Sequence, residues 1–116
     1  MTPTELLNQH TPAAEELPAR IEELNLAASD VQDHISELSD LAGQHEEQAT
    51  TEAATESNDI KRKSRRAELL RADSAYQEIR REISEQERVR LRLAERAHRL
   101  AREHRLVIAR CYQQAF

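Results

Sequence analysis

The chain has 116 residues, of which 34% are charged and 3% aromatic, and it contains one glycine and three prolines. So few turn-forming and β-forming residues exclude a sheet or barrel, and the composition is typical of long helices. The net charge of −5 is divided unevenly, because residues 1–57 carry thirteen acidic side chains and one basic one, whereas residues 58–116 carry nine acidic and sixteen basic side chains. We expect the two halves to attract each other if they lie side by side.

The N-terminal residues carry two helix-start patterns. A threonine followed by a proline, at positions 2–3 and again at 11–12, is typical of a capping residue ahead of the first helical position. Pro18 lacks an N–H and clashes with the preceding turn, so it favours a helix boundary. We therefore expect short helical segments over residues 1–17 and a first long helix over residues 18–55.

The predicted first long helix carries apolar residues at alternating spacings of four and three. They are Leu17, Ile21, Leu24, Ala28, Val31, Ile35, Leu38, Ala42, His45 and Ala49. Such a heptad seam is the stripe by which one helix packs against another. After Ala49 the stripe gives way to Thr, Ser, Asn and Asp, whose side chains compete with helical backbone bonds, which predicts a turn at residues 56–59.

A second seam follows in the predicted helix over residues 60–115. It consists of Leu69, Ala72, Tyr76, Ile79, Ile83, Gln86, Arg90, Leu93, Ala97, Leu100, His104, Val107 and Cys111. It is one residue out of step with the first, which a single continuous helix would absorb only through two discontinuities. A turn between two helices explains this one-residue shift with a single interruption. The sequence therefore predicts an all-α fold, an antiparallel two-helix coiled-coil hairpin forming one domain over residues 1–116, open to dimerisation into a four-helix bundle.

The hairpin has a preferred register, in which paired residue numbers sum to 114. Every seam residue of one helix then faces a seam residue of the other. Ile35 meets Ile79 in this register, and Leu38 meets Tyr76. Further along the chain, Ala42 is predicted to meet Ala72.

Several polar residues interrupt the seams. Gln86 and Arg90 either fix the register or mark the approach of a third element. We favour the simpler interpretation that the aliphatic part of Arg90 lies along the seam while its guanidinium stays in water. His10 is predicted to lie opposite His104, with Cys111 two turns further on. A zinc site needs three or four convergent ligands, so no metal and no cofactor is expected here.

A basic cluster opens the predicted second helix. Its members are Lys61, Arg62, Lys63, Arg65 and Arg66. Such a row of cations suits phosphates or an acidic partner, and further arginines continue it along the helix. Glutamates interleaved at three- and four-residue spacings instead favour a solvated, self-paired helix face, and no aromatic residues alternate with the charges to stack bases.

The C-terminal segment is more apolar than one seam requires. Ala94, Ala101, Ile108 and Ala115 form a second stripe beside the first. The candidate partner-binding residues are Leu106, Ile108, Tyr112 and Phe116. So wide a stripe needs more than one neighbouring helix, which is either the N-terminal segment folded back, a second copy, or another protein.

The sequence contains no pattern that indicates catalysis: no Gly-rich phosphate loop, nucleophile elbow or Ser/His/Asp arrangement. We therefore expect a non-enzymatic protein–protein interaction module, such as an adaptor, assembly factor, small chaperone or structural subunit, that acts by helix docking and self-association. The alternative is a nucleic-acid-binding hairpin that uses the arginine-rich second helix, and a metal-dependent bundle enzyme is a third hypothesis. No apolar run approaches ~18 residues, no secretory signal is evident and Cys111 is the lone cysteine, so we expect a cytoplasmic protein without membrane contact.

Overall fold

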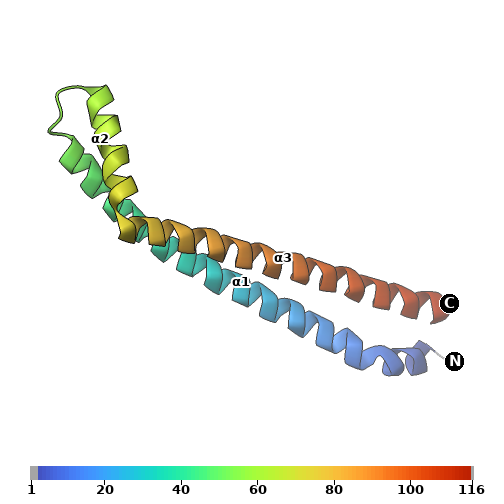
Figure 1. Cartoon of the computed structure of the whole chain (residues 1–116). Helices are drawn as coiled ribbons and strands as arrows, with labels where there is room; N and C mark the ends of the chain where they lie inside the picture. The colour runs from blue at the N-terminus through green and yellow to red at the C-terminus, as the bar shows by residue number, and fades with distance from the viewer. Residues whose placement is uncertain (1–2, 116) are drawn as a thin grey trace. The chain divides into compact units, whose positions relative to one another are not determined.

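The computed structural model describes the backbone of residues 3–115 and the side chains of residues 16–114, and it confirms the all-α prediction for that range. Helix α1 spans Pro3–Ala53, α2 spans Asp59–Ala72 and α3 spans Ser74–Ala115 (Figure 1). Contacts divide the chain into two units, which are described separately. The terminal unit comprises residues 1–30 and 89–116, and the central unit comprises residues 31–88. A single coiled-coil hairpin domain and its dimerisation stay predictions.

Helix α1 corrects the expectation of short helical segments over residues 1–17. It is one continuous helix from Pro3 to Ala53 and passes through Pro18 without a break. A proline inside a helix costs about 3 kcal/mol, because it removes one hydrogen bond and crowds the carbonyl four residues earlier. Pro18 is exposed, so water can reach the carbonyl that has lost its donor. The helix therefore continues where the sequence pattern favoured a boundary.

The connection after α1 lies close to the predicted turn. It covers residues 54–58, so it begins two residues and ends one residue earlier than the predicted range of 56–59. Asn58 caps α2, because its side-chain oxygen accepts a hydrogen bond of 2.9 Å from the backbone N–H of Lys61. This is the helix-start role that Asn residues commonly have, and it satisfies a donor that lacks a partner inside the helix.

The predicted second helix over residues 60–115 is interrupted at Asp73, which is a second correction. Asp73 has an extended backbone and separates α2 from α3. Its backbone N–H donates to the Leu70 carbonyl at 3.3 Å, and its side chain accepts from the backbone N–H of Tyr76 at 3.0 Å. One residue thus ends α2 and caps α3.

The central unit has its core where the predicted seams meet. Ile35, Ala42, Tyr76 and Ile83 are buried, and Val31, Leu38, Leu70 and Ile79 pack against them. The cluster contains both residues of the predicted pairs Ile35–Ile79 and Leu38–Tyr76. Ala72, the predicted partner of Ala42, is instead exposed, because the chain leaves the helical path at the next residue.

Burial follows the predicted seams along most of their length. Every seam residue from Leu17 to Ala49 and from Tyr76 to Cys111 is buried or half-buried. The first seam also extends one turn further than expected, because Ala53 is only 2% exposed. Apolar residues at heptad spacing therefore mark the buried side of α1 and α3 within each unit. The local exception is the interruption at Asp73.

Candidate functional site

The predicted partner-binding residues lie on more than one side of α3 in the terminal unit. Leu106, Ile108 and Tyr112 are 57%, 39% and 62% exposed, and Phe116 lies outside the described residues. Ile108 and Tyr112 are separated by ~40° around a helix, whereas Leu106 and Ile108 are separated by ~160°. The structure therefore brings Ile108 and Tyr112 to one side and places Leu106 on another.

Leu106 belongs to a groove between α1 and α3. This groove is lined by Glu16, Leu17, Arg20, Glu103, Leu106, Val107 and Arg110. Its mixture of apolar and charged side chains of both signs suits a partner helix with an apolar stripe and polar flanks. It offers no enclosed space in which a small molecule would be buried.

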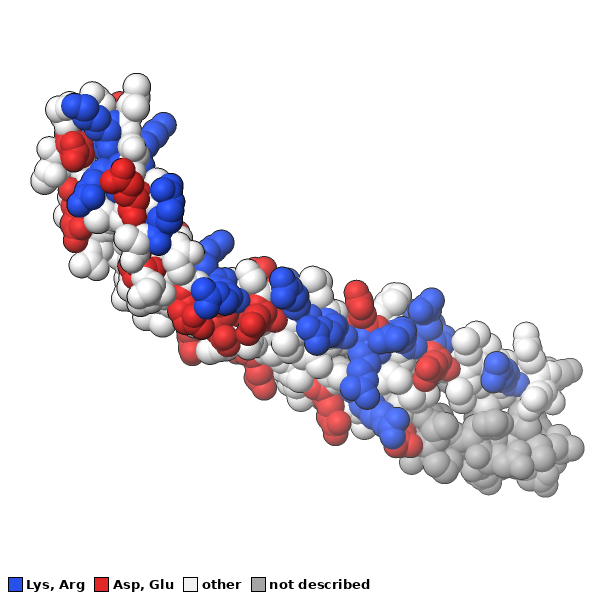
Figure 2. All heavy atoms as spheres, in the orientation of Figure 1, with Lys and Arg blue, Asp and Glu red and all other residues white. Residues whose placement is uncertain are grey.

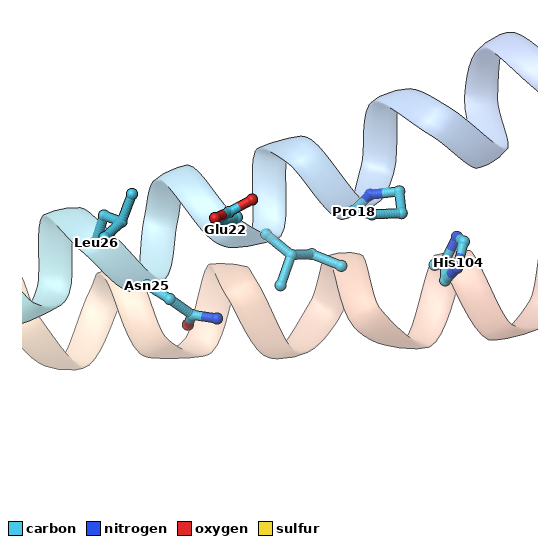
Figure 3. Close-up of a pocket in the computed structure, with 6 residues that line it drawn as sticks. Pro18, Glu22, Asn25, Leu26 and His104 are labelled. Atoms are coloured by element: carbon cyan, nitrogen blue, oxygen red, sulfur yellow. The ribbon is translucent and has the colours of Figure 1, made fainter.

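A second groove between the same helices is more apolar. Pro18, Ile21, Glu22, Asn25 and Leu26 of α1 line it together with His104 of α3. Figure 3 shows Pro18 and His104 on the two facing helices at one end of the groove, with Leu26 at the other end. Leu26 is 60% exposed, so the apolar surface on this side of the terminal unit comes mainly from α1.

The basic cluster lies on α2, in the central unit. Arg62 pairs with Asp59 at 2.8 Å and Arg65 with Glu68 at 3.5 Å, so part of the cluster is self-paired as the interleaved acids indicated. The other members are Lys61 and Lys63, which are exposed, and Arg66, whose Nε donates to Thr50 Oγ1 of α1 at 2.9 Å. Figure 2 shows basic and acidic side chains intermingled on this part of the molecule.

Helix α2 differs from the other helices in its burial. None of its residues is buried, and Ile60, its most exposed apolar residue, is 82% exposed. Leu69 and Leu70 are half-buried, and Leu70 packs against the central core. Packing therefore explains little of the α2 sequence before Leu69.

A hydrogen-bonded network that sequence reasoning missed joins α1 to the start of α3. His45 Nδ1 lies 2.7 Å from Asp73 Oδ2, and the Tyr76 hydroxyl donates to Glu46 Oε1 at 2.7 Å. The rings of His45 and Tyr76 are tilted by 39° with centroids 6.3 Å apart. The available signal was the Asp73-Ser74 pair, a common helix-start combination within the apparently continuous second helix.

The network shifts the ionisation of two of its members. The backbone N–H of Tyr76 and then the side chain of His45 stabilise the ionised Asp73 carboxylate and lower its pKa. The hydrogen bond to Glu46 raises the pKa of Tyr76, because the carboxylate favours the protonated phenol, and burial acts in the same direction. Both pKa shifts favour the forms that make the hydrogen bonds of the network, which are the ionised Asp73 carboxylate and the neutral Tyr76 phenol.

Two polar side chains in the second seam have buried atoms without a hydrogen-bond partner, Arg90 Nε and His104 Nδ1. Gln86, one turn from Arg90, donates to Glu82 at 3.1 Å. His10 lies outside the residues whose side chains are described, so its predicted position opposite His104 stays a prediction. Within residues 16–114, no group of His, Cys, Asp and Glu side chains is arranged to hold a metal ion.

Comparisons with known proteins give no assignment: no family model, no curated protein and no solved structure matches the chain. Over the described residues, no helix combines the length and apolar character needed to cross a membrane.

Proposed function

We propose that the chain is a non-enzymatic protein–protein interaction module that acts by helix docking at the C-terminal part of α3. The observation that carries the proposal is the exposure of Ile108 and Tyr112 on a helix whose seam already packs against α1. Exposed apolar side chains at adjacent positions on one helix side are typical of docking surfaces. An adaptor, an assembly factor, a small chaperone and a structural subunit all use such a surface.

A pull-down from the native host tests this proposal. The intact chain is compared with a double variant, Ile108→Ser with Tyr112→Ser, and we expect the variant to lose the captured protein because the apolar contact area is removed. The matched control is Leu41→Ser, which changes a residue on α1 that is 45% exposed. Equal capture by the intact chain and the double variant would contradict the proposal.

A second candidate function is binding to nucleic-acid phosphates through α2. The observation that favours it is that α2 has no buried residue yet carries six basic and two acidic side chains. Residues that packing does not require are available for a polyanionic partner, and phosphate binding needs such cations. Among the described residues, the exposed cations of α2 that form no ion pair are Lys61, Lys63 and Arg71.

Salt distinguishes the two candidate functions. Phosphate-driven binding weakens steeply between 50 and 200 mM salt, whereas apolar docking through α3 does not. A variant with Lys61→Glu and Lys63→Glu should lose retention on a nucleic-acid column if the second function is correct. Unchanged retention of this variant would exclude α2 as a nucleic-acid interface.

A further inference from the structure

A second stripe of heptad spacing runs along α3 in the terminal unit. Its members are Leu91, Ala94, His98, Ala101, Arg105, Ile108 and Tyr112. Ala101 is half-buried and the others are exposed, Leu91 at 55%. The stripe lies roughly 100° around the helix from the seam that packs against α1, on a side of α3 that is mostly exposed.

This stripe is complementary to itself when it is read in the opposite direction. If two copies of α3 lie antiparallel with residue numbers that sum to 199, Leu91 of each copy meets Ile108 of the other. Between these two apolar contacts, each Ala101 meets His98 and each Ala94 meets Arg105. In these two central pairs a small side chain faces a larger one, which allows the two helices to approach closely.

The charges beside the stripe select the same arrangement. Glu95 and Arg102 follow the stripe on its outer side, both are exposed, and neither forms an ion pair within the described part of the chain. In the antiparallel register, Glu95 of each copy lies next to Arg102 of the other. An antiparallel register one heptad shorter would bring the two Glu95 side chains together, and a register one heptad longer would bring the two Arg102 side chains together, so repulsion disfavours both alternatives.

We infer that a second copy of this chain docks on the stripe, as an antiparallel α3–α3 pair whose two-fold axis passes between Arg99 and Leu100. The apolar contacts of Leu91 with Ile108 and the ion pairs of Glu95 with Arg102 each occur twice, as a two-fold interface requires. This inference rests on the proposed function, in that it identifies a second copy as the helix that docks on α3.

A charge-exchange series tests the register. Glu95→Arg and Arg102→Glu each create two like-charge pairs across the axis, and each should raise the dimer dissociation constant about tenfold or more in sedimentation equilibrium at low salt. The double variant, Glu95→Arg with Arg102→Glu, restores opposite charges and should return the constant to that of the intact chain. Arg110→Glu is the matched control, since Arg110 lines the groove against α1 on another side of α3 and its substitution should change the constant little.

Spin labels test the direction of the two helices. A single label at Gln113, in a Cys111→Ala background, should report a distance of roughly 40 Å between copies, because 27 residues separate Gln113 from its counterpart along the helix axis. A parallel pair would give a short distance at this position and would overturn the inference.

The outcomes separate this inference from the proposed function. A chain that stays monomeric, or a dimer that Arg102→Glu does not weaken, overturns the second copy as the occupant of the stripe. If the Ile108 and Tyr112 variant still loses a captured protein in that case, the proposed function stands with a different partner. If the dimer forms as inferred and the pull-down shows no dependence on these residues, docking of other proteins fails and self-association stands.

Discussion

At the residue scale, Asp73 has three structural roles. It ends α2, caps α3 and pairs with His45 of α1. The chain has no proline or glycine at this point, so the interruption of a predicted continuous helix depends on one side chain that competes with the helical backbone. Tertiary contact decides the outcome, because His45 lies where it can hold the carboxylate.

Substitutions of Asp73 separate its capping role from its charge. Asp73→Asn keeps an oxygen that can cap α3 but loses the charge that pairs with His45, whereas Asp73→Ala loses both. We therefore expect the urea midpoint at neutral pH to fall for Asn and to fall further for Ala. Asp40→Asn, an exposed change on α1, serves as the control, and equal midpoints for all three variants would contradict the assignment.

Acid should remove the charge contribution of Asp73. Because its pKa is lowered in the folded chain, the carboxylate stabilises the fold fully above its ordinary pKa of ~3.9, and this stabilisation is lost as the pH falls through the lowered value. Urea unfolding of the intact chain and of Asp73→Asn, measured from pH 7 down to pH 2, should give midpoints that converge at the acidic end. A gap that stays constant over this range would show that the charge is not responsible.

At the element scale, α1 contains a glycine at a position where neither the backbone conformation nor the packing requires one. Gly43 lies in the middle of α1, has no positive φ, and a Cβ at this position would meet nothing within 4 Å. Gly43→Ala should therefore raise the free energy of unfolding by about 1 kcal/mol, because alanine loses less backbone entropy on folding. Thermal unfolding by circular dichroism measures the gain. Ala28→Gly, a change of the opposite kind at a half-buried position of the same helix, should lower the stability.

The sequence predicted some features of these helices and not others. Heptad spacing identified which residues of α1 and α3 are buried, since apolar periodicity and burial have the same physical cause. The continuity of α1 through Pro18 could not be predicted, because the cost of a proline depends on whether water reaches the freed carbonyl. Of the candidate partner-binding residues, Leu106, Ile108 and Tyr112 are exposed, and helix spacing alone already separates Leu106 from Ile108 around α3.

At the scale of the whole molecule, the two halves carry opposite charges, yet no arginine–carboxylate pair joins α1 to α3 among residues 16–114. Within residues 16–114, the arginine ion pairs join residues of the same helix, as in Arg20–Glu16 and Arg81–Glu78. The ion pairs that connect α1 to later residues in this range are His34–Glu82 and His45–Asp73. Attraction between the halves therefore acts through the general field of the charges. Such a field is screened over about 10 Å at 0.1 M salt.

This arrangement predicts how the chain responds to salt. At a fixed protein concentration, the free energy of unfolding in urea should fall when sodium chloride is raised from 0.02 to 0.5 M, because screening weakens the attraction between the acidic and the basic half. Guanidinium chloride, which is itself a salt, should then give a smaller extrapolated stability than urea. A stability that rises with salt would show that repulsion within each half dominates.

The lack of buried residues in α2 predicts which of its positions tolerate substitution. Before Leu69 its side chains add nothing to the interior, so most replacements there leave folding intact provided that the helix and its Asn58 cap are kept. In a saturation library scored only for soluble expression, most substitutions should therefore be tolerated at Lys61 and Lys63, and few at Ile83. If few substitutions at the two lysines are tolerated when the same library is scored for fitness in the living host, the cause must be an interaction of the chain with another cellular component.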